Sequence, residues 1–422
     1  MIAKYIKRDI YKELWNDIDK KEMAFLLGPR QAGKTTLMRN LQTELEKKNE
    51  KTVFLSLDFE PDSKYFSSQQ YLMRKIKLEI GEKKGYVFID EIQRKENAGI
   101  FLKGIYDLNL PYKFILSGSG SVDLKSKIKE SLVGRKREYE IFTVSLKEFI
   151  NFKTQYKYES NLEEFFKLEA ESLNELLLEY LNFGGYPRVV LETELREKTK
   201  IIDEIYQGYI EKDISYFLNV EKIEAFRLLI KVLADQMGKL LNYSEISNTL
   251  GISLPTVKNY LWYAENTYVL QRISPFFRNA RTEISKSPVI YFVDNGLRNY
   301  ALGIFGKLER PDDLGFSFQN LVYQIMEERL RFTNNKIHYW RTKSGAEIDL
   351  IIDFGRNVIP MEIKYADMNK PVIPRSFYGF IDKYSPEKCF VINKNLKISL
   401  KINQSKILFM SVFDLLFENI DE

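Results

Sequence analysis

Two residue types that often build stabilised or metal-bound folds are nearly absent from this sequence. Its 422 residues include one cysteine, Cys389, and one histidine, His338. A single cysteine excludes a disulfide framework and any zinc site built from several cysteines, and it favours the reducing cytoplasm as the location. No apolar run reaches the length of a membrane-spanning helix, and residues 1–8 carry charge too often for a signal sequence. We therefore expect a cytoplasmic protein without a membrane partner.

A strong excess of one charge is also missing. Lysine and arginine number 64 against 59 aspartate and glutamate residues, which gives a formal net charge of +5. This small excess permits nucleic-acid binding without arguing for it, because local clustering of charge matters more than the total. The length exceeds that of one ordinary hydrophobic core and predicts several modules.

A glycine-rich loop near the N-terminus fits the pattern G-x-x-x-x-G-K-[ST], between an apolar strand at residues 23–27 and a helix that continues from Thr36. Backbone N–H groups of such a loop, and the positive end of the helix, bind phosphate. Lys34 would reach the β- and γ-phosphates, and the Thr35 hydroxyl would bind Mg²⁺. The sequence therefore predicts a site for ATP and Mg²⁺ formed by Gly28, Pro29, Arg30, Gln31, Ala32, Gly33, Lys34, Thr35 and Thr36.

A second apolar strand, residues 86–90, ends in two adjacent carboxylates, Asp90 and Glu91. Asp90 at the strand tip would hold Mg²⁺ beside Thr35, and Glu91 would polarise the attacking water. The alternative is a strand that ends in a solvated acidic turn. After a phosphate loop, the pair favours ATP hydrolysis.

Two further features are candidates for completing this site. Ser117 or Ser119, at the end of the strand at residues 113–117, could sense the γ-phosphate, or both could be ordinary turn residues. Arg135 lies in a basic turn and could serve as an arginine finger for this site or for that of a neighbouring copy. A solvated charge run is the alternative. A homo-oligomer is thus a candidate state.

The order of patterns indicates the architecture. Short apolar strands at 52–57, 86–90, 113–117 and 138–142 alternate with helical stretches, which predicts a parallel sheet covered by helices. Residues 159–239 are almost entirely helical in pattern, with a sharp break at Gly184–Arg188.

Residues 242–273 resemble a winged helix-turn-helix. A helix at 244–250, a turn at 251–253 and a helix at 256–263 precede a β wing from Val269. The second helix would present Thr256, Lys258 and Asn259 to a DNA major groove. The alternative is a unit used for packing or protein contacts, since the helix carries a single lysine.

A strand at 346–353 and a return strand at 358–364 carry a different set of polar residues. Side chains two positions apart share a strand face, so Glu347 lies with Asp349, and Glu362 with Lys364. If these faces meet, Asp349 and Glu362 would bind Mg²⁺, and Lys364 would activate a water for phosphodiester attack. The alternative is the polar face of an ordinary hairpin.

In combination, these motifs resemble a prokaryotic family of AAA-type ATPases whose C-terminal domain of unknown function is similar to the PD-(D/E)XK nuclease fold. The resemblance is carried, in chain order, by residues 28–36, 88–93, 116–119, 134–135, 184–187, 289–296, 339–341, 347–349 and 362–364. It implies an α/β chain of four modules. These are an AAA-like P-loop ATPase domain at 1–150, a helical domain at 151–238, a winged helix-turn-helix domain at 239–300, and a restriction-endonuclease-like α/β domain at 301–422.

One position departs from the family pattern. Where the family usually has glutamate before the nuclease-like hairpin, this chain has Gln319, a neutral amide and a poorer metal ligand. Either Glu327, two turns later, substitutes for it, or the domain has lost cleavage. We therefore expect an ATP-driven switch that binds DNA or a protein partner. An ATP-dependent DNA nuclease and a nucleic-acid motor are the alternatives.

Overall fold

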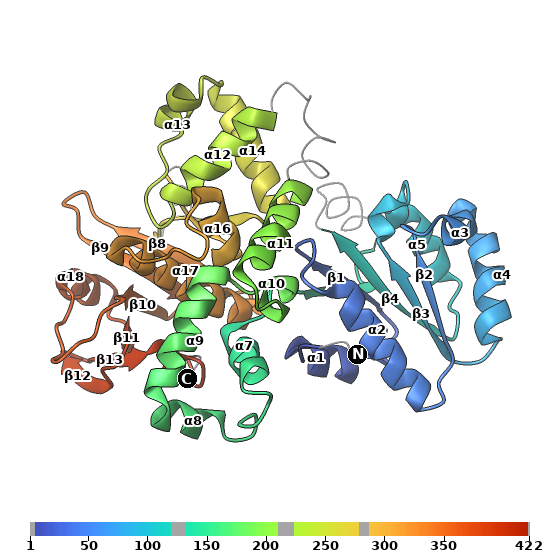
Figure 1. Cartoon of the computed structure of the whole chain (residues 1–422), viewed down its shortest axis with the longest axis horizontal. Helices are drawn as coiled ribbons and strands as arrows, with labels where there is room; N and C mark the ends of the chain where they lie inside the picture. The colour runs from blue at the N-terminus through green and yellow to red at the C-terminus, as the bar shows by residue number, and fades with distance from the viewer. Residues whose placement is uncertain (1–4, 120–131, 210–222, 278–286, 421–422) are drawn as a thin grey trace.

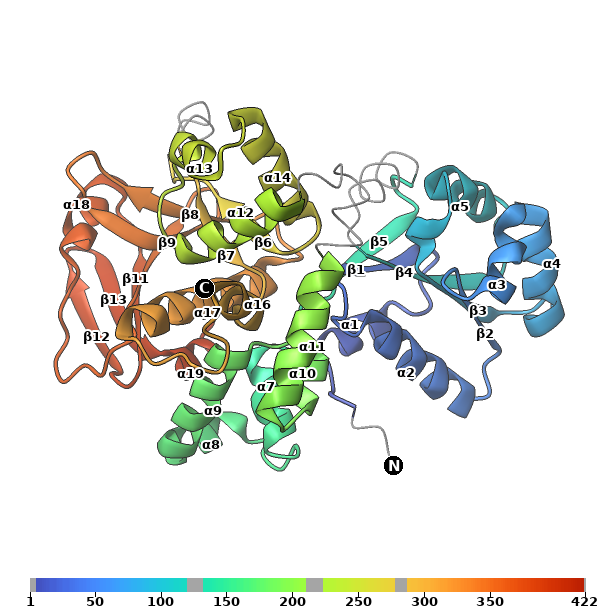
Figure 2. The same cartoon turned by 45° about the horizontal axis from the view of Figure 1, so that its top comes forward.

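The computed structural model describes residues 5–119, 132–209, 223–277 and 287–420 (Figure 1). The N-terminal third forms one end of the molecule, the C-terminal sheet forms the other, and helices from the middle of the chain lie between them (Figures 1 and 2). Within the described residues, none of the helices is long and apolar enough to cross a membrane.

The N-terminal module is built on a five-stranded, all-parallel sheet in the order β2-β3-β4-β1-β5. Its strands are β1 (Met23–Gly28), β2 (Thr52–Ser56), β3 (Gly85–Asp90), β4 (Tyr112–Ser119) and β5 (Lys136–Glu140). Its helices are α1 (Ile10–Asn16), α2 (Lys34–Lys47), α3 (Glu60–Ser63), α4 (Gln69–Ile80) and α5 (Ala98–Asp107).

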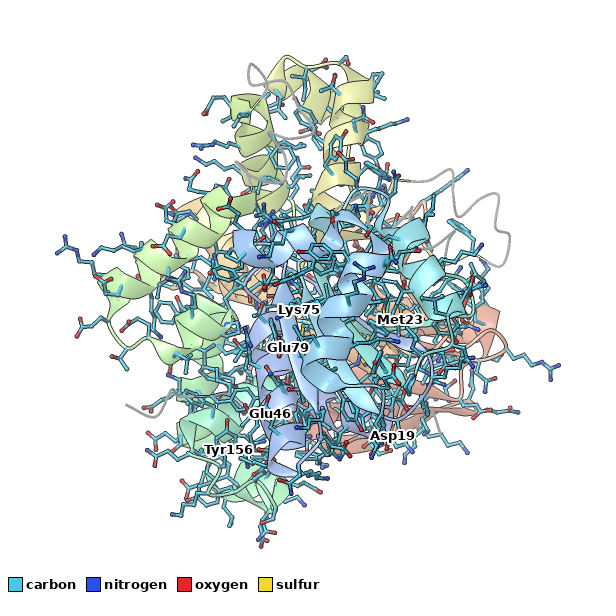
Figure 3. The ribbon with its side chains drawn as sticks, turned by 90° about the vertical axis from the view of Figure 1, so that its right-hand side faces the viewer. Asp19, Met23, Glu46, Lys75, Glu79 and Tyr156 are labelled. Carbon is cyan, nitrogen blue, oxygen red and sulfur yellow. The ribbon has the colours of Figure 1, made fainter. Side chains whose placement is uncertain are left out.

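Helices cover both faces of this sheet, so its central strands are apolar on both sides. The buried residues of α1 and α2 pack on one face, and those of α4 and α5 pack on the other. Figure 3 views the module from its outer side, where Lys75 and Glu79 form an ion pair on the exposed surface of α4. The predicted parallel sheet is confirmed. Its last strand begins two residues before the predicted start at residue 138, although the Ile141 N–H still donates to the Leu27 carbonyl.

Five helices follow the sheet: α7 (Leu146–Lys153), α8 (Leu162–Leu168), α9 (Ala170–Phe183), α10 (Pro187–Leu191) and α11 (Leu195–Gly208). Helix α7 begins with a capping box in which Ser145 and Glu148 each accept the other's backbone N–H. The glycines at 184 and 185 end α9 where the chain passes close to other backbone. A Cβ on Gly185 would lie 2.2 Å from the Val144 carbonyl oxygen, and the Gly185 N–H donates to Asp294 at 2.7 Å.

The next unit contains α12 (Ile223–Asp235), α13 (Tyr243–Leu250), α14 (Leu254–Asn266), β6 (Leu270–Ile273), β7 (Val289–Phe292) and α16 (Asn295–Leu302). The predicted helix–turn–helix is present. Gly251 ends α13 in the left-handed conformation, and Ser253 caps α14. Strands β6 and β7 pair antiparallel, and part of the loop between them lies outside the described residues. The assignment of this unit as a DNA-binding winged helix stays a prediction.

The C-terminal unit is a long helix followed by a mixed six-stranded sheet in the order β12-β13-β11-β10-β9-β8. Its elements are α17 (Pro311–Leu330), β8 (Lys336–Arg341), β9 (Glu347–Asp353), β10 (Val358–Ile363), α18 (Arg375–Tyr384), β11 (Lys388–Asn393), β12 (Ile398–Ile402), β13 (Ser405–Ser411) and α19 (Val412–Leu415). Strands β8, β9 and β10 are antiparallel neighbours, and β10, β11 and β13 run parallel. The predicted hairpin is β9–β10.

The units after the ATPase-type sheet are not separate bodies. One continuous buried cluster runs from α7 through the helical and middle units to the C-terminal sheet. Residues 274–276 after β6 also extend the C-terminal sheet, because the Phe276 N–H donates to the Tyr339 carbonyl at 2.6 Å. The predicted boundaries near 238 and 300 therefore fall inside a shared core.

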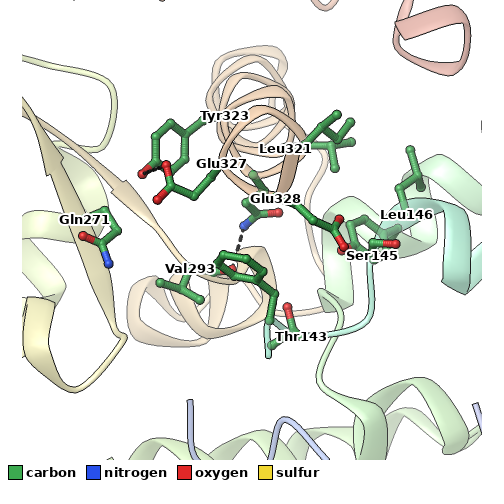
Figure 4. A pocket seen from close by; sticks show the side chains of 13 residues that line it. Thr143, Ser145, Leu146, Gln271, Val293, Leu321, Tyr323, Glu327 and Glu328 are labelled. Carbon is green, nitrogen blue, oxygen red and sulfur yellow. Dashed lines mark hydrogen bonds between the residues drawn. The ribbon is translucent and has the colours of Figure 1, made fainter. Parts of the chain in front are cut away.

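The far end of α17 contacts the N-terminal module. Arg331 pairs with Glu13 of α1 at 3.3 Å, and the rings of Phe332 and Tyr139 meet edge to face. One turn earlier, Glu327 and Glu328 line a cavity of about 40 Å³ between α17 and residues 142–146 (Figure 4). Burial, and then the nearby Glu140 carboxylate, raise the pKa of Glu327 to about 7.

A pH-dependent stability follows from Glu327. In the folded chain the pKa of the Glu327 carboxyl lies above its ordinary value of 4.5. The protonated carboxyl therefore contributes fully to the free energy of unfolding below pH 4.5, and this contribution is lost as the pH rises through 7. We expect Glu327→Gln to stabilise the chain by about 1–3 kcal/mol at pH 8, with little effect at pH 4.5. Urea unfolding at the two pH values measures the difference. The exposed Glu175→Gln on α9 is the control, and an equal effect at both pH values would contradict the assignment.

Candidate functional site

The phosphate loop turns sharply out of β1. Gly28 has φ 147°, and a Cβ there would lie 2.2 Å from the Ile141 carbonyl oxygen. Gly33 has φ 93° and precedes the first residue of α2, Lys34. The N-terminus of α2 therefore points its free N–H groups at the space enclosed by the loop, which suits an anion.

Side chains of the loop lie beside the tips of β3 and β4. The Thr35 hydroxyl donates to Asp90 at 2.8 Å. The buried Lys34 ammonium donates to the carbonyls of Gly28 at 3.0 Å and Pro29 at 2.6 Å. Since β4 lies between β1 and β3, Ser117 at its end donates to the other oxygen of Asp90. This donor set fits Mg²⁺ and a nucleotide phosphate, because a hydroxyl, a carboxylate and an ammonium meet beside the loop.

Glu91 follows Asp90 in the left-handed conformation, with φ 58°. This conformation is costly for a residue other than glycine, and active sites are among the places where such strain persists. It turns the carboxylate toward the same cavity as Lys34. Burial raises the pKa of Glu91, the nearby Lys34 lowers it, and Asp90 raises it. A raised pKa brings a carboxylate closer to the range of a general base at neutral pH.

A cavity of about 690 Å³ lies over the loop, a volume typical of ligand sites. Figure 2 shows α10 and α11 beside β1 and α2. The cavity walls come from both modules: Tyr5, Ile6, Arg8, Arg30, Gln31, Gly33, Lys34, Thr35, Thr36, Leu37 and Glu91 from the first, and Pro187, Arg188, Leu191, Glu204, Gln207 and Gly208 from the helices. The Arg188 guanidinium donates to Gln31 at 3.0 Å and to Glu204 at 2.8 Å.

Arg8 is a site residue that the sequence analysis missed. Its guanidinium donates to the loop carbonyl of Ala32 at 2.9 Å and to Glu148 at 2.9 Å. It also donates to the carbonyls of Phe142 at 2.6 Å and Thr143 at 3.1 Å. No local pattern marks this arginine in the sequence. Arg188 was also missed, although the break at residues 184–188 is a visible signal.

The predicted role of Arg135 in its own chain is wrong. The Met23 N–H, at the start of β1, donates to the Arg135 carbonyl, whereas the phosphate loop follows the other end of β1. A strand of this length separates the two by about 20 Å. The guanidinium of Arg135 pairs with Asp107 at 2.9 Å. A role at a neighbouring copy stays a prediction.

Ser117 is fully buried behind Asp90, and its hydroxyl also accepts the Glu91 N–H at 3.2 Å. It positions the two carboxylates, and it is absent from the cavity wall. A direct contact with phosphate stays a prediction. The side chain of Ser119, the alternative, lies outside the described residues.

The polar residues of β9 and β10 do converge. Asp349 accepts the Ile363 N–H at 2.7 Å and a Gln319 amide N–H at 3.0 Å. Lys364 pairs with Glu362 at 2.7 Å. Burial raises the pKa of Asp349, and the Glu362 carboxylate raises it further. In the described parts of the chain, no three His, Cys, Asp or Glu side chains are arranged to hold a metal ion.

Glu327 does not substitute for Gln319. It accepts a hydrogen bond from Tyr323 at 3.2 Å and lies near Glu140 of the N-terminal module. Eight residues exceed two helical turns by almost one residue and advance about 12 Å along the axis. Glu327 therefore faces a different neighbour.

The second helix of the helix–turn–helix exposes Lys258 and Asn259. Thr256 is less available than predicted, because its hydroxyl lies 2.8 Å from that of Ser253 in the helix cap. The exposed Trp262 lies one turn further along the same helix.

Three protein-family models match successive parts of the chain. Residues 20–150 match the model described as an AAA domain, which covers the phosphate loop, Asp90 and Glu91. The chain contains an AAA-type ATPase domain. Residues 174–308 match one domain of unknown function (DUF8612), and residues 314–412 match another (DUF4143).

The relatives share most of this chain. An uncharacterized protein of Methanocaldococcus jannaschii is 28% identical over 406 residues, which cover 94% of this chain and 85% of that protein. An uncharacterized protein of Mycobacterium tuberculosis is 26% identical over 373 residues, or 88% of this chain and 76% of that protein. Their descriptions name no activity.

Among solved structures, the replication initiator DnaA bound to AMPPCP and single-stranded DNA aligns with a TM-score of 0.30 and 17% identity, covering 62% of this chain and 90% of that one. The Pif1 helicase of Candida albicans aligns with a TM-score of 0.24 and 14% identity, covering 35% and 43%. Overlaps at these scores carry no weight for fold or function.

We expect Lys34→Ala to weaken nucleotide binding at least tenfold, because a hydrogen bond from a charged group to phosphate is worth about 1.5–3 kcal/mol. Titration with a fluorescent ATP analogue and Mg²⁺ measures the change. Lys47→Ala, at the exposed end of the same helix, removes the same charge away from the loop and is the control. Equal affinities for the two variants would place the phosphates elsewhere.

Proposed function

We propose that this chain is an ATP-driven switch, which binds and hydrolyses ATP and uses the nucleotide state to change its contact with DNA or a protein partner. The observation that carries the proposal is the hydrogen bond between Thr35 and Asp90. It joins the phosphate loop to the carboxylate strand beside a cavity that also holds Lys34 and Glu91. Transfer of a nucleotide phosphoryl group needs this combination.

Each residue of the site has a separate task. The loop N–H groups and Lys34 would bind phosphate oxygens, with Lys34 exchanging its present carbonyl partners for them. Thr35 and Asp90 would hold Mg²⁺, whose charge offsets that of the phosphates. Glu91 would orient the attacking water and accept its proton.

Arg188 is the arginine that we propose for the same active site. It lies on the cavity wall and belongs to the helical module, not to the sheet that carries the loop. Its contacts with Gln31 and Glu204 are exposed, so they are weak enough to be exchanged for phosphate. Arg188 would then draw the helices toward the γ-phosphate and release them after hydrolysis.

A route from the loop to the C-terminal unit starts at Arg8. This arginine holds the carbonyl of Ala32 and the carboxylate of Glu148. Glu328 of α17 is half-buried among charges that include Glu148, Arg331 and Arg8. Arg331 in turn pairs with Glu13. A movement of the loop would therefore change the charges that α17 meets.

The output surface that we propose is α14. Its place in a helix–turn–helix favours DNA. Its single lysine, Lys258, and the 42% exposed Trp262 favour a protein partner. A DNA partner and a protein partner would both bind the same face of α14.

A nuclease is the second candidate. Asp349, Glu362 and Lys364 converge as it requires, but N–H groups of Gln319 and Ile363 contact both oxygens of Asp349. A motor is the third. As a ring, it would use Arg135 on a neighbouring copy, but nothing within the described residues identifies a translocating loop.

The deciding measurement is ATP turnover with and without duplex or single-stranded DNA, with the DNA from the same reactions analysed on a gel. We expect turnover with intact DNA. Glu91→Gln should keep nucleotide binding and lower turnover by about 10²–10⁴-fold, the usual contribution of a general base. Glu96→Gln, exposed nearby, is the control. Unchanged turnover in Glu91→Gln would remove Glu91 from the mechanism, and Mn²⁺-dependent nicking would favour the nuclease.

The switch has its own test in Arg8→Lys. The variant keeps the positive charge, but an ammonium cannot contact Ala32, Phe142 and Glu148 together. In the Glu91→Gln background, we expect ATP to change amide hydrogen exchange at the C-terminal end of α17, and Arg8→Lys to abolish that change. Arg74→Lys, exposed on α4, is the control. If the exchange still responds in Arg8→Lys, the coupling runs through other contacts.

A further inference from the structure

The carboxylates of β9 and β10 meet positive or N–H groups of the protein itself. N–H donors contact both oxygens of Asp349, one from the Ile363 backbone and one from the Gln319 amide. One oxygen of Glu362 pairs with Lys364 at 2.7 Å, and Glu347 pairs with Arg341 at 3.4 Å. Donor hydrogens thus occupy positions where a divalent cation would need oxygen lone pairs.

Gln319 provides the donor that reaches farthest across this cluster. Its amide nitrogen donates to Asp349 and to the hydroxyl of Tyr291, both at 3.0 Å. Tyr291 belongs to β7 of the middle unit and is stacked on Tyr323 of α17, with ring centroids 4.4 Å apart. The turn at Gly238 covers the other side, since a Cβ there would lie 2.8 Å from the Gln319 amide oxygen.

One observation would favour a cation site. The second oxygen of Glu362 is buried and has no hydrogen-bond partner in the described structure. A single free carboxylate oxygen is a poor divalent site here, because the adjacent Lys364 ammonium repels a second cation and both oxygens of Asp349 already accept N–H donors. The cluster as it stands does not fit a divalent metal.

We infer that this cluster is an internally neutralised polar junction between the middle unit and the C-terminal sheet, and that Gln319 is the residue that keeps divalent cations out. In its place, a carboxylate would remove the donor to Asp349 and add a third acidic ligand beside Asp349 and Glu362. The single substitution Gln319→Glu should therefore create a metal site. This inference does not depend on the proposed ATP switch.

The test is Mn²⁺ binding by the full chain without nucleotide, followed by electron paramagnetic resonance. All proteins carry Asp90→Asn, so that the candidate Mg²⁺ site of the AAA domain does not contribute. We expect no bound Mn²⁺ with Gln319 present and one per chain with Gln319→Glu. Mn²⁺ should also raise the melting temperature of that variant alone, because a ligand that binds the folded state stabilises it.

Two further variants separate the causes. Adding Glu362→Gln to Gln319→Glu should abolish Mn²⁺ binding, and Gln319→Leu should lower the melting temperature without creating a site. Mn²⁺ binding with Gln319 present that is lost on Glu362→Gln would overturn the inference, and so would a folded Gln319→Glu variant that binds none. If Gln319→Glu fails to fold, the comparison of the Gln319 chain with its Glu362→Gln variant still decides.

Discussion

One buried arginine joins the phosphate loop to the rest of the chain. Arg8 meets Ala32 in the loop, Phe142 and Thr143 after β5, and Glu148 at the start of α7. A guanidinium can do this because its five N–H donors lie in one rigid plane. With side chains 8% and 3% exposed, Arg8 and Glu148 form a pair whose separation would leave a buried charge, at a cost of about 3–5 kcal/mol.

The nucleotide cavity depends on that attachment. Its floor belongs to the AAA domain and its roof to the helices that carry Arg188 and Gln207. The glycine pair at residues 184–185 passes close to Val144 and Asp294, which sets where α10 begins. The helices that form the roof share their buried core with the middle and C-terminal units. A shift of these helices would therefore also change their packing against those units.

Helix α17 contacts both the C-terminal sheet and the AAA domain. Near its middle, Gln319 donates hydrogen bonds to Tyr291 and Asp349. At its other end, Glu328 and Arg331 meet charges of the AAA domain. The middle of the helix is thus held by hydrogen bonds to the middle unit and the C-terminal sheet, and its C-terminal end lies among charges of the AAA domain.

Local sequence determined the features that depend on neighbouring residues. The phosphate loop, the two carboxylates at the end of β3, the helix–turn–helix and the shared strand faces of β9 and β10 all follow from short-range periodicity and turn chemistry. Tertiary structure alone decided which end of a strand faces the nucleotide, and this placed Arg135 far from the loop. It also decided the partners of Arg8, Arg188 and Glu327. The residues next to them in the sequence do not reveal these contacts, because each partner is distant along the chain and is brought close by strand order and helix packing that no local pattern encodes.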